Sequence, residues 1–150
     1  MAARIVHDKI CARVALLMTW INHYLSATYE DGSRGPDKYD CWGLAREVLH
    51  KFYGWDLMPS WGSVRHTSPR LMTAAQRNTT NKLVECSPSD GVLVGVFRGK
   101  LMIHAAVIIE IDGALAALEI NPKQGARWSR IPEFERQYLK VVYYDQRLPE

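Results

Sequence analysis

One short stretch constrains the fold of this chain more than any other: residues 39–44, with the sequence YDCWGL. Aspartate is a preferred N-cap residue, so Asp40 predicts a helix whose first turn carries Cys41. Apolar residues then recur at helical spacing and predict one buried face, formed by Leu44, Ala45, Val48, Leu49 and Phe52. Because Gly54 supplies a left-handed stop, we expect the helix to end near Tyr53.

The predicted position of Cys41 has a chemical consequence. A thiol on the first turn of a helix meets the positive end of the helix dipole and unpaired backbone N–H groups, and both favour the thiolate. The same N–H groups can hold a developing oxyanion. Free cysteines are also among the most buried residue types, so a purely structural Cys41 is the alternative.

Length and composition indicate one domain over residues 1–150. The chain is 47% hydrophobic and 23% charged, which is ordinary for a globular domain. Its net charge is +3 without a dense basic run, which argues against dedicated nucleic-acid binding. The three cysteines lack metal-ligand spacing, so neither a disulfide framework nor a zinc site is expected.

An apolar stretch over residues 10–25 predicts an amphipathic helix of roughly residues 8–27, within an N-terminal segment (1–30) that covers the core. Arg13, Asn22 and His23 interrupt the stretch, so no membrane span is expected. It lacks a small-residue cleavage site, so we also expect no signal peptide and a chain made in the cytoplasm.

The middle of the chain, residues 55–81, has an irregular pattern with one helical piece predicted over residues 69–77. Trp55 and Trp61 in this stretch either line a groove or pack structurally. A polar loop over residues 30–38 delivers the chain to Asp40.

The second half of the chain is typical of strands. Apolar runs over residues 92–97, 101–111, 115–120 and 138–144 predict four of them, with a helical turn at residues 132–135. Asp112-Gly113 between two runs predicts a two-residue hairpin. Helices followed by strands predict an α+β fold with N-terminal helices packed on an antiparallel β-meander.

The hairpin register brings three polar residues together. If Asp112 and Gly113 form the turn, His104 faces Asn121 across the pair, and Glu119 lies two residues along on the same face. A general base with a residue that orients it needs this arrangement. Since a buried carboxylate needs a partner, Glu119 and His104 are expected to interact. A structural role for His104 is the alternative.

These motifs resemble the NlpC-type cell-wall peptidase family, and its bacteriophage branch most. DCWGL at residues 40–44 resembles the family's nucleophile motif, and HAAVII at residues 104–109 resembles its histidine strand. SDGVLV at residues 89–94 is similar to the run that opens the first strand, with Gly and Asp exchanged. GARWSRI at residues 125–131 resembles the segment after the third active-site strand.

The resemblance implies a papain-like core with Cys41 as nucleophile and His104 as base. The family usually has His, Asn or Gln at the third position, where this chain has Glu119, with Asn121 as the other candidate. Tyr39 or the backbone N–H of Cys41 is expected at the oxyanion site, and Trp42 at the substrate site.

The function implied is hydrolysis of an amide bond in peptidoglycan stem peptides, with no metal and no organic cofactor. Action in the cell wall or periplasm then requires delivery by phage tail or secretion-machine proteins, or a place in the virion tail. Two alternatives remain open. One is a tail-tip or assembly protein that keeps the fold without activity, and the other is an acyltransferase that uses the same Cys-His pair.

Overall fold

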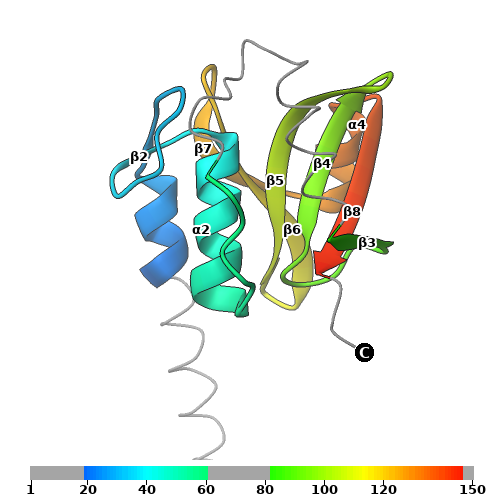
Figure 1. Cartoon of the computed structure of the whole chain (residues 1–150), viewed down its shortest axis with the longest axis horizontal. Helices are drawn as coiled ribbons and strands as arrows, with labels where there is room; N and C mark the ends of the chain where they lie inside the picture. The colour runs from blue at the N-terminus through cyan, green and yellow to red at the C-terminus, as the bar shows by residue number, and fades with distance from the viewer. Residues whose placement is uncertain (1–18, 61–81, 147–150) are drawn as a thin grey trace, which may run out of the picture.

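A computed structural model describes residues 19–60 and 82–146 of the chain. Its elements, in chain order, are β1 (Thr28–Tyr29), β2 (Lys38–Tyr39), α2 (Cys41–Tyr53), β3 (Leu83–Cys86), β4 (Leu93–Arg98), β5 (Leu101–Ile111), β6 (Ala114–Asn121), β7 (Gly125–Arg130), α4 (Ile131–Arg136) and β8 (Lys140–Gln146). Six of the strands form one antiparallel sheet, and α2 packs against β5 and β6 (Figure 1). The chain is therefore α+β, as predicted.

The helix that carries Cys41 begins and ends as its capping signals predict. Asp40 accepts a hydrogen bond from the backbone N–H of Gly43 at 2.8 Å, and Gly54 closes the helix in the left-handed conformation with φ 70°. The predicted buried face is confirmed with one exception, because Phe52 is 41% exposed. Phe52 instead stacks on Trp20, and the two ring centroids are 4.3 Å apart.

The sheet is only in part the predicted meander. Its strand order is β3-β8-β4-β5-β6-β7, so β4 to β7 follow one another and β8 returns to pair with β4. The apolar run of β8 predicts a strand but not its partner, since pairing between distant segments is decided by packing. The patterns of β3 and β7 gave no strand prediction, and both lie at the sheet edges.

Side chains on the two faces of the sheet enter different cores because successive strand residues point to opposite faces. On one face, Leu44 and Val48 of α2 pack with Val107 and Leu118. On the other face, Phe134 of α4 packs with a second set of strand residues, which comprises Val94, Ala106, Ile108 and Ala117.

The hairpin between β5 and β6 forms at the predicted turn. Asp112 and Gly113 both have positive φ values, 53° and 77°, which the two central residues of such a turn require. Ile111 pairs with Ala114, and the register continues to Val107 and Leu118, where the paired region ends.

Only part of the helix predicted near the N-terminus lies within the described residues. Residues 19–25 are helical and bury Ile21 and Tyr24, whereas the rest of the predicted helix over 8–27 lies outside the described residues. The helical piece predicted over 69–77 and Trp61 also lie outside them. Among the described residues, no helix has the length and apolar character that crossing a membrane requires.

Candidate active site

Cys41 lies at the start of α2 and is held there by its neighbour Asp40. Besides Gly43, the Asp40 carboxylate accepts hydrogen bonds from the N–H of Gly32 at 3.0 Å and from Arg34 at 2.7 Å. A Cβ at Gly43 would lie 2.5 Å from the carbonyl oxygen of Ser33, so only glycine allows this close approach. The preceding loop is thus fixed against the first turn, and Cys41 itself is 3% exposed.

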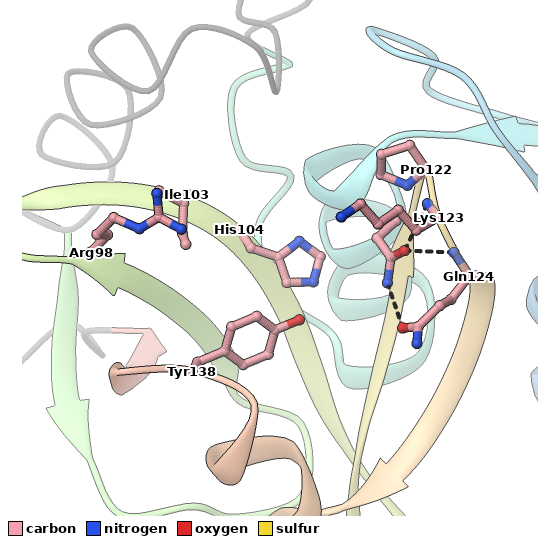
Figure 2. A pocket seen from close by; sticks show the side chains of 8 residues that line it. Arg98, Ile103, His104, Pro122, Lys123, Gln124 and Tyr138 are labelled. Carbon is pink, nitrogen blue, oxygen red and sulfur yellow. Dashed lines mark hydrogen bonds between the residues drawn. The ribbon is translucent and has the colours of Figure 1, made fainter.

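His104 lies on β5 next to an irregularity of the strand. It pairs with Val96 of β4, but the next pair is Phe97 with Met102, so Ile103 is inserted without an opposite residue. Such bulges bend a strand and redirect its side chains. Figure 2 shows the His104 side chain between the ribbons of β5 and β6.

The imidazole of His104 links Cys41 to Glu119. Its Nε2 atom lies 3.0 Å from Oε2 of Glu119, and the ring is also hydrogen-bonded to Cys41. Because Nε2 faces the carboxylate, Nδ1 is the nitrogen that remains for the sulfur atom. His104 shares its sheet face with Ala106, whereas Cys41 packs near Ala105 on the other face. The separation of β5 and β6 beyond Val107 and Leu118 allows the ring to reach both partners.

Glu119 is fully buried, and both oxygens of its carboxylate have hydrogen-bond partners. Oε1 accepts from Nε of Arg127 at 2.9 Å, while Oε2 faces His104 and also accepts from the hydroxyl of Tyr138 at 3.3 Å. Burial raises the pKa of this carboxyl, but the hydrogen bonds and charges of His104 and Arg127 outweigh it and hold the pKa below the ordinary value. Glu119 is therefore an anion at neutral pH.

The same balance acts on His104. Burial lowers its pKa, but the hydrogen bonds and negative charges of Cys41 and Glu119 raise it to about 9. His104 is thus an imidazolium at neutral pH, between a carboxylate and a sulfur atom. Such an imidazolium favours the thiolate form of a neighbouring cysteine, and chemically the pair can serve as a nucleophile and a proton donor.

Asn121, the other candidate for the third position, makes its hydrogen bonds inside a turn. Its Oδ1 accepts from the backbone N–H groups of Lys123 at 3.0 Å and Gln124 at 2.8 Å. The β5–β6 pairing does not extend to His104 and Asn121, so the predicted direct opposition of these residues is wrong. Glu119 is the residue that meets His104.

The two residues predicted for the oxyanion and substrate sites point elsewhere. Tyr39 is 1% exposed and donates its hydroxyl proton to Glu47, so this proton does not serve an oxyanion. Trp42 is half-buried and donates its indole N–H to the carbonyl of Pro59 at 2.9 Å. The backbone N–H of Cys41, on the open first turn of α2, is the remaining predicted oxyanion donor.

The segment after α2 returns along the helix toward Cys41. His50 is hydrogen-bonded to the carbonyl of Trp55, Arg46 to that of Met58 and Trp42 to that of Pro59. These three helix residues are four apart and share one face, so the segment runs antiparallel to α2. The indole of Trp55 is buried in the core, which identifies its role as packing.

Three residues that lie around Cys41, His104 and Glu119 were not among the predicted site residues. Arg127 and Tyr138 both contact Glu119, and Arg127 is its cross-strand partner on β7. Asn121-Pro122 and Gly125 are turn signals that predict a hairpin here, and its register brings Arg127 opposite Glu119. Tyr29 of β1 lies close enough to Cys41 that the cysteine's charge, after burial, contributes to a raised tyrosine pKa.

A cavity of about 440 Å³ opens beside His104 (Figure 2). It is lined by Arg98, Ile103, His104, Asn121, Pro122, Lys123, Gln124 and Tyr138. Within residues 19–60 and 82–146, no group of three His, Cys, Asp or Glu side chains could hold a metal ion. Comparisons of the chain with known protein families, curated proteins and solved structures gave no match.

Proposed function

We propose that this protein is a thiol hydrolase that cleaves an amide bond through Cys41, His104 and Glu119. The observation that carries the proposal is the position of one imidazole, which is hydrogen-bonded to Glu119 through Nε2 and to Cys41. A structural cysteine needs no buried imidazolium beside it, and a structural histidine needs no carboxylate with two further donors.

The reaction proceeds in two steps. The Cys41 thiolate attacks the carbonyl carbon, and the backbone N–H groups at the start of α2 stabilise the oxyanion. The His104 imidazolium then gives its proton to the leaving amine as the C–N bond breaks, which leaves a thioester. In the second step, His104 removes a proton from water, and the hydroxide formed attacks the thioester. The acid is released, and the Cys41 thiolate is restored beside the imidazolium.

Glu119 holds the imidazole in place throughout this cycle. Its negative charge favours the imidazolium form, and its hydrogen bond to Nε2 keeps Nδ1 toward the sulfur. Arg127 and Tyr138 in turn fix the carboxylate. This order of residues, with a cysteine that opens a helix packed on an antiparallel sheet, supports a papain-like core.

We propose peptidoglycan stem peptides as the substrate class, because DCWGL and HAAVII resemble the motifs of NlpC-type cell-wall peptidases. The pair Cys41 and His104 occupies the positions that the resemblance gives to nucleophile and base. Delivery by a phage tail or a secretion machine is part of the same proposal.

Incubation with purified sacculi tests the proposal. Wild-type protein is expected to release peptides whose masses identify the cleaved bond, and Cys41→Ala should release none. Absence of products from both proteins, together with ordinary reactivity of Cys41, would favour an assembly protein without activity. Transfer of an acyl group to an added amine, without net hydrolysis, would favour the acyltransferase.

A further inference from the structure

The cavity beside His104 has a positive lining. Arg98 and Lys123 contribute two cations, and the His104 imidazolium is a third. None of its described lining residues is an aspartate or a glutamate. Glu119, which contacts the lining residue His104, is fully buried and is already neutralised by His104 and Arg127. Such a lining attracts anions.

The two cations are presented by turns on either side of His104 (Figure 2). Arg98 ends β4, and Lys123 lies in the turn between β6 and β7. The Asn121 side chain fixes that turn by accepting hydrogen bonds from the backbone of Lys123 and Gln124. In the described part of the chain, neither cation is within ion-pair distance of a carboxylate.

The proton transfer from His104 to the leaving amine indicates which part of a substrate would lie near this cavity. His104 donates to the leaving amine, so the leaving group lies on the side of the imidazole that it approaches. Because His104 itself lines the cavity, the cavity is adjacent to the position of that amine. A carboxylate on the leaving group would then meet Arg98 and Lys123.

We propose that this cavity is a carboxylate site, in which Arg98 and Lys123 recognise an acidic group on the leaving side of the scissile amide. The assignment to the leaving side rests on the proposed hydrolysis, whereas the preference for a carboxylate rests on the lining alone. The substrate class is accordingly an amide whose leaving amine belongs to an amino acid with a free carboxylate.

A binding experiment tests the site without turnover. N-acetyl-alanine and its carboxamide are titrated into Cys41→Ala protein, with NMR signals of His104 and Tyr138 as the readout. The carboxylate is expected to bind at least about fivefold tighter, because each exposed charge contributes modestly. Roughly 1 M salt should remove most of the difference, since the Debye length is then about 3 Å.

Matched variants show whether the two cations are responsible. The double variant Arg98→Gln, Lys123→Gln should lose most of the preference for the carboxylate, since His104 alone then remains as a cation of the lining. Lys100→Gln is the control, because Lys100 is an exposed cation of the same β4–β5 turn that does not line the cavity. Its preference should equal that of wild type. Equal binding of the two probes by wild type, or loss of the preference in Lys100→Gln, would overturn the site.

The leaving-side role is tested with two peptides, L-alanyl-γ-D-glutamyl-L-lysine and its C-terminal carboxamide. Wild type should cleave the carboxylate form with about tenfold higher kcat/KM, and the double variant should lose that preference. Equal rates in wild type overturn the leaving-side assignment. If the protein is inactive on sacculi and on both peptides, the proposed hydrolysis fails, and the binding experiment alone decides the carboxylate site.

Discussion

His104 Nε2 and Glu119 Oε2 lie 3.0 Å apart, although the two residues are not partners in the β5–β6 pairing. Their contact forms where the paired region ends and a bulge bends β5. Two ionised groups with almost no access to water thereby stabilise each other.

Cys41 should react faster with iodoacetamide than Cys86. At about pH 6.5, only about 1% of an ordinary thiol is ionised. Burial and the charge of Asp145 raise the pKa of Cys86 further, whereas Cys41 faces the His104 imidazolium. Peptide mass spectrometry of native protein should show at least about tenfold faster labelling of Cys41.

The control for that experiment is His104→Ala, which opens the site but removes the imidazolium. Labelling of Cys41 should slow in this variant, because ionisation rather than access limits the reaction. Faster labelling of Cys86 or of Cys11 in the folded wild type would contradict the assignment of the nucleophile.

Replacement of His104 should abolish turnover. His104→Ala removes the general acid and base, and such a loss lowers rates by about two to four orders of magnitude. Release of peptides from sacculi measures the effect, and circular dichroism verifies the fold. A variant that retains close to the wild-type rate would assign His104 a structural role.

The basic limb of the pH–rate profile should lie near pH 9 in wild type, because the imidazolium of His104 loses its proton there. Glu119→Gln removes a negative charge that raises this pKa, so the limb should move to lower pH and the rate should fall. Asn121→Ala should leave the limb in place, since Asn121 bonds only within its turn among the described residues. If the limb moves in Asn121→Ala and stays in place in Glu119→Gln, Asn121 is the residue that orients His104.

Arg127→Gln should destabilise the protein in a pH-dependent way. Loss of a hydrogen bond to a charged group costs about 1.5–3 kcal/mol of unfolding free energy at neutral pH. The folded-state pKa of Glu119 is depressed, so its charge stabilises the fold above about pH 4.5 and this contribution is lost as pH falls through the depressed value. The difference between variant and wild type should therefore shrink on acidification.

Arg130→Gln is the matched control for Arg127, since both arginines are on β7. Arg130 donates to the carbonyl oxygens of Ile111 and Ala114, which do not titrate. Its destabilisation, measured by urea unfolding between about pH 3 and pH 7, should change little with pH. If the destabilisation of the two variants depends on pH in the same way, Glu119 is excluded as the source of the pH dependence.

The Tyr138 hydroxyl should contribute less than Arg127. It lies 3.3 Å from Glu119, and burial followed by the Glu119 charge raises its pKa to about 12, so it stays protonated. Tyr138→Phe keeps the ring, whose centroid is 5.9 Å from that of His104. We expect a loss of about 1 kcal/mol or less in thermal melts, with sacculus cleavage retained within about threefold.

The sequence alone determined the elements that depend on near neighbours. Asp40 caps the helix through Gly43, Gly54 ends it, and Asp112-Gly113 closes the hairpin, because each interaction joins residues within a few positions of one another. Local signals also put Cys41 on a first turn and His104 on a strand.

Only the tertiary structure decided how these elements combine. The return of β8 to β4, the end of pairing at Val107 and Leu118, and the bulge at Ile103 depend on packing across the sheet. Strict pairing would bring His104 to Asn121, whereas the bend of β5 brings it to Glu119. The buried carboxylate also requires Arg127 from β7. Turn signals between β6 and β7 indicate a hairpin, but only packing across the sheet brings the guanidinium against Glu119 and both against His104.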